Sequence, residues 1–352
     1  MKMWKENTVF CEDLENLCQS ACIPWDSFHG KTVFITGGTG LIGYTAASAL
    51  LYYSMTRDCP LRVLLLVRSR DEAAARYAAQ INDGCDIDFI EGTVEELPAI
   101  AGHIDYIIHG ACPTASGYFL SHPAETARTI LLGTANLLAL AAEKRVSGMV
   151  FLSSMEVYGQ ISERRELPED DLGTVDISLP RSVYPEGKRM AENLCCAWAA
   201  EYGVPVAIVR LAQTFGPGVK RDDQRVFAYM ARCALDGEDI RLATAGDKEN
   251  MYLYTADAVS AILLLLARGE RGTAYNAGNP DTYCSVREMA ELTARTIGNG
   301  EISVRTNTGG QTAAFRPDGY LKLDVSRISA LGWRAGTSLG EMFRRMAACF
   351  DK

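Results

Sequence analysis

Short apolar runs alternate with longer amphipathic segments along the first 210 residues. Residues 31–36 form an apolar run that is too short for a helix and bounded by glycines, which predicts a buried strand. The same reasoning predicts further strands at 62–67, 87–90, 104–109, 148–153 and 204–210. It also predicts helices at 41–53, 71–81, 122–144 and 184–202. Strands that alternate with helices favour right-handed crossovers, so the predicted fold class is α/β with a doubly wound parallel sheet.

The two ends of the chain are organised differently. Residues 1–30 predict a helical extension that breaks at Pro24, and residues 160–180 predict a polar loop. Beyond residue 210, loops alternate with a short strand near Tyr275 and with helices near 225–236, 256–268, 285–297 and 338–350. We therefore expect three parts: the extension at 1–30, the sheet domain at 31–210, and a smaller, discontinuous C-terminal lobe at 211–352, of which some segments return to the sheet domain.

Composition and charge narrow the class of protein. At about 150 residues per domain, 352 residues provide for about two lobes with a substantial core. The net charge of −9 gives the surface no basic field, which argues against nucleic acid or an anionic membrane as a partner. A small anionic ligand remains possible, because it needs only a local cluster of arginine and lysine.

The cysteines and histidines show no metal-binding pattern. The 11 cysteines include no CxxC pair, and the 4 histidines do not cluster with them at zinc spacing, so no metal site is predicted. Cysteines spread so thinly are expected to be reduced and mostly buried. No apolar signal segment follows the charged N-terminus, and the most apolar stretch, 261–267, is shorter than the ~20 residues of a membrane span. We expect a cytoplasmic protein without membrane attachment.

A glycine-rich turn follows the first predicted strand. Its glycines are Gly37, Gly40 and Gly43, and the predicted helix starts at Leu41 and Ile42. Glycines at this spacing allow a sharp turn, let a pyrophosphate approach the backbone, and pack helix against strand, while the helix N-terminus attracts the phosphates. A tight turn without a ligand is the alternative. Its position inside a strand–helix–strand unit favours a Rossmann-type dinucleotide site.

The end of the second predicted strand bears on which dinucleotide binds. A carboxylate there would favour NAD, whereas this chain has Arg68 and Arg70, whose guanidinium groups suit the extra phosphate of NADP. The arginines could equally stack on adenine or face water, so NAD and NADP both stay open. Thr93 and Val94, after the third strand, are expected to close the adenine side.

Tyr184 and Lys188 lie four residues apart on a predicted helix, and therefore on one face of it. An ammonium group beside a phenol favours the phenolate, so we expect a lowered pKa for Tyr184 and a role as general base. The pair alone is a common surface pattern. Ser153 and Ser154, however, end a predicted parallel strand thirty residues earlier, where strand ends meet at a ligand crevice. The three elements together predict a catalytic site.

Over residues 31–335 the chain resembles an extended short-chain dehydrogenase/reductase of the NAD-dependent epimerase/dehydratase family, which acts mostly on nucleotide sugars. The resemblance rests on TGGTGLIG at 36–43, HGA at 109–111, SSMEVYG at 153–159, YPEGK at 184–188, RLAQTFGPG at 210–218, YTADAV at 254–259, YNAGNP at 275–280, LDVSR at 323–327 and LGW at 331–333. Several positions are most similar to UDP-glucuronate decarboxylases: Glu156, Arg181, Glu186 to Arg189, Thr214 to Pro217, Arg225 and Val226.

The resemblance implies a mechanism and a set of site residues. Tyr184 removes a proton from a sugar hydroxyl while hydride passes to the nicotinamide, Ser154 shares the hydrogen bond, and Lys188 binds the nicotinamide ribose. The implied cofactor-binding residues are Gly37, Gly40, Leu41, Ile42, Gly43, Arg68, Arg70, Thr93, Val94, Gly110, Ala111, Tyr184 and Lys188. Those implied for the substrate, in the C-terminal lobe and around the strand ends, are Pro113, Ser116, Arg181, Gln213, Arg225 and Arg316.

Four departures from the family pattern affect the expected substrate. Met155 and Glu156 replace the Asp-Glu pair of dehydratases, and a thioether cannot protonate a leaving hydroxide, so dehydration is disfavoured. Glu156 remains as a fourth catalytic residue, or as a charge paired with Arg181. Gln213 replaces the usual asparagine and Asn250 replaces an arginine that clamps the diphosphate, a role open to Arg225, Lys220, Arg221 or Arg316. Ile130 also replaces a polar asparagine.

Three functions remain open at this point. The first is a nucleotide-sugar decarboxylase or epimerase that acts through a 4-keto sugar and regenerates its cofactor. The second is a net NAD(P)H-dependent reductase or dehydrogenase of an activated sugar or polyol, motivated by Arg68 and Arg70. The third is a non-catalytic dinucleotide sensor. Resemblance also implies a homodimer, in which the helices at 122–144 and 184–202 pair with those of a second copy.

Overall fold

A computed structural model describes residues 4, 7–114, 116–306 and 319–350. Its centre is a parallel sheet with the strand order β11-β7-β5-β4-β1-β2-β3. In chain order these strands are β1 (Thr32–Thr36), β2 (Arg62–Val67), β3 (Ile87–Glu91), β4 (Tyr106–His109), β5 (Gly148–Ser154), β7 (Val206–Leu211) and β11 (Ala274–Ala277). The order reverses between β1 and β4, and in open α/β sheets the carboxyl ends of the strands at such a reversal are where ligands bind. The arrangement confirms the predicted fold class.

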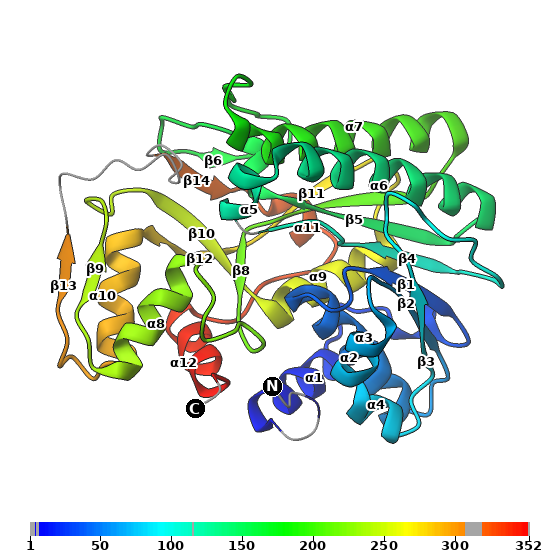
Figure 1. Ribbon diagram of the computed structural model, residues 1–352, viewed down its shortest axis with the longest axis horizontal. Coiled ribbons are helices and arrows are strands. Elements are labelled where there is room, and N and C mark those ends of the chain that lie inside the picture. Colours follow the sequence, from blue (N-terminus) through cyan, green and yellow to red (C-terminus); the bar gives the residue numbers. More distant parts are fainter. Residues whose placement is uncertain (1–3, 5–6, 115, 307–318, 351–352) are drawn as a thin grey trace.

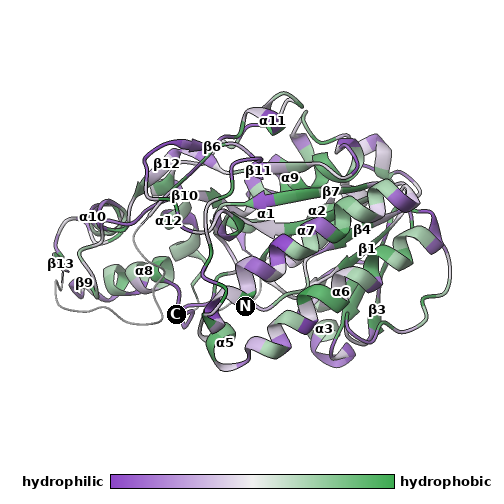
Figure 2. Ribbon diagram, turned by 90° about the horizontal axis from the view of Figure 1, so that it is seen from above, coloured by the Kyte–Doolittle hydropathy of each residue, from purple (hydrophilic) through white to green (hydrophobic). Residues whose placement is uncertain are grey.

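Helices cover both faces of this sheet (Figure 1). On one face lie α1 (Thr8–Gln19), α2 (Leu41–Thr56) and α9 (Thr255–Arg268), and on the other α6 (Pro123–Lys144) and α7 (Val183–Tyr202). Because neighbouring strand residues point to opposite faces, Val33 and Ile35 pack into the first core and Phe34 into the second. The long apolar strands are therefore buried on both sides. Figure 2 shows these strands largely in green, the colour of hydrophobic residues.

A second group of elements forms a smaller lobe beside the sheet (Figure 1). It contains a sheet of order β12-β10-β14-β6, with β8 paired to β10, and a two-stranded sheet β13-β9. The strands are β6 (Glu166–Leu167), β8 (Gln213–Phe215), β9 (Ile240–Leu242), β10 (Glu249–Tyr254), β12 (Asn279–Ser285), β13 (Val304–Thr306) and β14 (Tyr320–Leu323). The helices α8 (Val226–Asp236), α10 (Val286–Thr296) and α12 (Leu339–Ala348) enclose a third core around Phe215 and Phe343. The division of the chain into domains at 30 and 210 stays a prediction.

Some elements differ from those expected. The helix predicted at 71–81 is two helices, α3 (Arg70–Arg76) and α4 (Ala78–Asn82), because the backbone at Tyr77 leaves the helical range. Short elements lie in the segments expected to be loops or left unassigned: β6, β8, β9, β10, β12, α5 (Ser116–Ser121), α11 (Ser326–Ser329) and three 3-10 turns at Trp25–Phe28, Met155–Tyr158 and Pro180–Ser182. Among the described residues, no helix is both long and apolar enough to cross a membrane.

Candidate active site

The glycine turn between β1 and α2 forms a cradle without side chains. Gly37 has φ +76°, and a Cβ on it would lie 2.8 Å from the carbonyl of Gly110. A Cβ on Gly43 would lie 2.3 Å from the carbonyl oxygen of Gly37. The first amides of α2, at Leu41 and Ile42, belong to a helical turn whose N–H groups have no partner within the helix. This backbone fits the pyrophosphate of a dinucleotide.

The end of β4 lies directly beside this cradle. The Gly110 amide donates to the carbonyl of Thr36 at 3.1 Å, and the Ala111 amide donates to its hydroxyl at 3.2 Å. Thr36 also contacts Nδ1 of the buried His109 at 2.8 Å. The structure therefore brings Gly110 and Ala111 to the glycine turn, at the reversal of strand order.

The two arginines after β2 have different surroundings. The Arg70 guanidinium donates to the carbonyl of Phe89 at 2.8 Å and to Asp88 at 3.0 Å, so strand β3 already holds it. Arg68 is exposed at the carboxyl end of β2. Val94 is buried and packs against Gly133 of α6. Of the two arginines, Arg68 is the one available to a ligand at this end of the crevice.

Ser154, Tyr184 and Lys188 meet where β5 ends and α7 begins. Ser154 ends β5, and its side chain hydrogen-bonds with Tyr184. Lys188 is 4% exposed, and its ammonium donates to the carbonyl of Leu152 at 2.7 Å. It lies 4.5 Å from the ring centroid of Phe151 and 5.9 Å from that of Tyr184. The predicted constellation is thus assembled in space.

The acidity expected of Tyr184 is corrected by the structure. Burial raises the pKa of the phenol well above its usual value, and Cys112 and Glu156 raise it further. The hydrogen bond with Ser154 and the charge of Arg181 lower the pKa by less. Burial also lowers the pKa of Lys188, whose ammonium is directed to a backbone carbonyl. The predicted lowering of the Tyr184 pKa is therefore wrong for this arrangement, in which burial raises it.

Glu156 and Arg181 form an ion pair next to the phenol. Nη2 of Arg181 lies 3.1 Å from Oε2 of Glu156, and the backbone amide of Glu156 donates to Ser154 Oγ at 3.2 Å. Nε of Arg181 is buried and has no hydrogen-bond partner among the described residues. The pairing that the sequence left open for Glu156 is present, and it leaves a guanidinium donor unused.

The substrate residues expected from the family pattern are only partly brought together. Gln213 lies in β8, paired with Tyr252 of β10. Arg225 donates to Asp223 at 2.6 Å, so its charge already has a partner. Pro113 lies between β4 and α5, and α5 starts at Ser116, whose side chain is not described. Arg316 lies outside the described residues.

Two residues near Tyr184 were not singled out from the sequence. Phe119 of α5 is 1% exposed and stacks on the Tyr184 ring, with centroids 4.4 Å apart and an interplanar angle of 11°. Cys112, just after β4, interacts electrostatically with both Tyr184 and Lys188. Neither residue belongs to a periodic segment. Their position after the carboxyl end of a parallel strand was the one signal that pointed to them.

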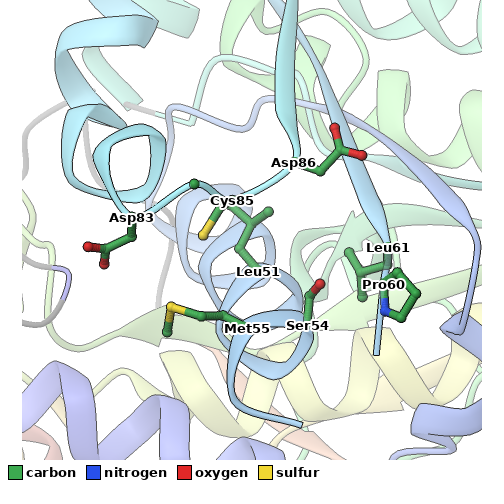
Figure 3. A pocket seen from close by; sticks show the side chains of 9 residues that line it. Leu51, Ser54, Met55, Pro60, Leu61, Asp83, Cys85 and Asp86 are labelled. Carbon is green, nitrogen blue, oxygen red and sulfur yellow. The ribbon is translucent and has the colours of Figure 1, made fainter. Parts of the chain in front are cut away.

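Two pockets in the described part of the chain lie elsewhere. One has a volume of about 210 Å³ and is lined by Leu51, Met55, Leu61 and their neighbours at the end of α2 and the starts of β2 and β3 (Figure 3). The other, of about 420 Å³, lies between α1 and α12 beside Arg345. The first is at the amino ends of the parallel strands, opposite the carboxyl ends where Ser154 and Tyr184 meet.

Comparison with known proteins identifies the family. The family model described as NAD dependent epimerase/dehydratase family matches residues 33–278, which is more than half of the chain. The chain belongs to this family. It is therefore an enzyme of the NAD-dependent epimerase/dehydratase type, which confirms the resemblance found in the sequence.

Individual members of the family and their structures agree with this assignment. UDP-glucuronic acid decarboxylase 1 of Xenopus tropicalis is 33% identical over 324 residues, which cover 92% of this chain and 72% of the relative. UDP-glucuronic acid decarboxylase 3 of Arabidopsis thaliana is 33% identical over 241 residues, or 68% of this chain and 67% of the relative.

Solved structures share the fold at lower identity. A UDP-glucose 4-epimerase from Thermotoga maritima has a TM-score of 0.74 and 20% identity, and covers 90% of this chain and 98% of its own. MoeE5, solved with UDP-glucuronic acid and NAD, has a TM-score of 0.71 and 24% identity, with coverages of 90% and 97%. Both confirm the fold class.

Proposed function

We propose that this enzyme is an NAD-dependent nucleotide-sugar decarboxylase or epimerase that acts through a 4-keto sugar. The observation that carries the proposal is the meeting of Ser154, Tyr184 and Lys188 at the same carboxyl edge of the sheet as the glycine cradle. The relatives named UDP-glucuronic acid decarboxylases support the decarboxylase form.

NAD is the proposed cofactor, in agreement with related structures that contain it. Bound at the cradle, it would supply reversible hydride exchange with the sugar carbon that becomes the ketone. Leu41 and Ile42 would meet its pyrophosphate, and Lys188 its nicotinamide ribose. Arg68 is the one feature that favours NADP, since its guanidinium is exposed at the end of β2.

The side chains of this protein move and hold protons around the sugar. Tyr184 exchanges a proton with the sugar oxygen: as phenolate it accepts the hydroxyl proton, and as phenol it returns a proton to the carbonyl oxygen. Ser154 holds the same oxygen by a hydrogen bond. Arg181, whose buried Nε has no partner among the described residues, suits a carboxylate on the substrate, which favours a uronic-acid sugar over a neutral one.

A panel of nucleotide sugars tests this function. The purified protein is incubated with UDP-glucuronate, UDP-glucose and their dTDP, GDP and CDP counterparts, and the products are identified by NMR. We expect UDP-glucuronate to lose CO2 without a net change in absorbance at 340 nm. Release of an oxidised or reduced sugar product, together with a steady change in absorbance at 340 nm, would instead support the second function, a net reductase or dehydrogenase.

We also propose a homodimer built on α6 and α7. Leu132 of α6 and Met190 of α7 are each 46% exposed, and both lie on the outer face of the helix pair. Apolar side chains at such a face are suited to a four-helix contact with a second copy. Light scattering that gives the mass of one chain would contradict this. A cytoplasmic location stays a prediction.

A further inference from the structure

The break between α3 and α4 places a tyrosine beneath the glycine turn. Tyr77 is fully buried, and its hydroxyl donates a hydrogen bond of 2.6 Å to the carbonyl oxygen of Gly38. The two residues are 39 positions apart in the sequence. In Figure 1, α3 and α4 lie beside α2, the helix that follows the turn. A side chain from a separate segment thus reaches the middle of the cofactor cradle.

The turn itself has few means to fix its own backbone. Gly37 and Gly38 carry no side chains, and glycine visits many backbone conformations, so ordering them has a large entropic cost. The turn has one internal hydrogen bond, from the Gly40 amide to the carbonyl of Gly37 at 3.0 Å. A second fixed point, on the carbonyl of Gly38, determines the orientation of the peptide that joins Gly38 to Thr39.

That orientation has a consequence for the ligand side of the turn. All described peptides are trans, so the N–H of Thr39 points away from the carbonyl of Gly38. Gly38 is buried, whereas Thr39 and Gly40 are exposed. Holding the carbonyl inward on Tyr77 therefore keeps it out of the crevice, where its partial negative charge would repel a pyrophosphate.

The Tyr77 hydroxyl is itself held in place. Its ring lies 5.0 Å from that of Tyr44 and 6.0 Å from that of Phe89, measured between centroids. Burial raises the pKa of the phenol well above its usual value, so it remains a hydrogen-bond donor at all working pH values. The donor is thus permanent and has little freedom to move.

We propose that Tyr77 is a positioning residue for the dinucleotide: through Gly38 it holds the glycine turn in the conformation that receives the pyrophosphate. The bond forms before the ligand arrives, so binding does not have to order the turn. This inference rests on the proposed function only in requiring that a dinucleotide binds. It adds α3 and α4 to the elements that determine cofactor affinity.

Tyr77→Phe tests the proposal, because it removes only the hydroxyl. The matched control is Tyr44→Phe, a neighbouring buried tyrosine whose hydroxyl accepts from Gln80 at 3.1 Å. Dissociation constants of NAD⁺ and NADP⁺ are measured by calorimetry on dialysed protein, together with the melting temperature without nucleotide. We expect about tenfold weaker binding for Tyr77→Phe, less than about twofold change for the control, and an unchanged kcat at saturating cofactor.

The outcomes separate this inference from the proposed function. If Tyr77→Phe binds both dinucleotides as tightly as Tyr44→Phe and the wild type, the bond does not position the turn for the ligand, and the proposal is wrong whatever the melting temperatures are. If the wild type binds neither dinucleotide, the proposed function fails as well. Should Tyr77→Phe not fold, the hydroxyl proton of Tyr77 is observed by NMR in wild-type protein with labelled tyrosine. Slow exchange with water in the nucleotide-free state supports the proposal, and rapid exchange overturns it.

Discussion

At the scale of single residues, burial dominates the chemistry of the active site. Tyr184 is 8% exposed and Lys188 4%, so both pKa values shift toward the neutral forms. Burial therefore favours the protonated phenol of Tyr184, which lies next to the ion pair of Glu156 and Arg181.

Replacement of the phenol isolates its role in proton transfer. We expect Tyr184→Phe to lower kcat by about 100-fold or more, because general acid–base catalysis contributes factors of this size. Dinucleotide binding should persist, since Lys188 and the glycine cradle are unchanged. The control is Tyr202→Phe, on the same helix but 58% exposed. Turnover of the true substrate at the wild-type rate by Tyr184→Phe would refute the proposed mechanism.

The site residues predicted from the sequence share a local signature. Gly37, Gly40 and Gly43 follow a buried strand, and Tyr184 and Lys188 have helical spacing, so short-range pattern was sufficient. Phe119 and Cys112 were missed because their role depends on tertiary contact with Tyr184. The acidity of Tyr184 was misjudged for the same reason, since sequence spacing says nothing about desolvation.

At the scale of elements, a buried polar network joins α7 to the strands that carry the site. Glu192 of α7 accepts from Ser153 of β5 at 2.5 Å and from Arg210 of β7 at 2.7 Å. Arg210 also donates to Tyr158 at 3.1 Å and to the carbonyl of Glu169 at 2.6 Å. Glu192 lies one helical turn beyond Lys188, so the network determines how α7 lies on β5.

Breaking this buried pair should be far more costly than breaking a surface pair on the same helix. We expect Glu192→Gln to lower the free energy of unfolding by about 3 kcal/mol, because the Arg210 charge loses its partner. The control, Glu186→Gln, removes a half-exposed pair with Arg189 and should cost less than about 1 kcal/mol. Urea denaturation measures both. Equal losses for the two variants would show that the network carries no special stability.

The boundaries of a strand or helix could be predicted where the local sequence pattern marks them. The strands of the large sheet are short apolar runs between glycines or turns, and they were found. The sequence pattern at 71–81 predicts one continuous helix. In the structure the backbone of Tyr77 is not helical, and its side chain contacts Gly38. Strand β6 pairs with β14, more than 150 positions away, so no local pattern marks either.

At the scale of the whole molecule, the N-terminal and C-terminal helices meet. Arg345 of α12 donates to Asp13 of α1 at 2.9 Å and to the hydroxyl of Tyr254 at 2.9 Å. Tyr254 in turn donates to Asp13 at 2.6 Å. The helical extension therefore connects the large sheet, on which it packs, to the smaller lobe. Burial raises the pKa of Asp13 to about 6, so stability falls as pH rises from about 4 to 6 through this group.

His109 should give global stability the opposite dependence on pH. It is 2% exposed and bonded to Thr36 and Thr134, and burial lowers its pKa from 6.5 to about 3. Below pH 6.5 the unfolded chain binds a proton here that the native protein does not. The free energy of unfolding should therefore decrease as the pH is lowered below 6.5, by up to about 1.4 kcal/mol per pH unit from this group.

His109→Asn removes this contribution without adding a titrating group. We measure the free energy of unfolding by urea denaturation between pH 7 and 5 and plot it against pH. The slope should be smaller in His109→Asn than in the wild type, by most of the amount that one bound proton contributes. Asp13 is present in both proteins, so the comparison cancels its opposing effect. The control variant is His29→Asn, at an exposed histidine far from this site in the sequence. An unchanged slope in His109→Asn would mean that His109 takes up its proton in the native protein as readily as in the unfolded chain.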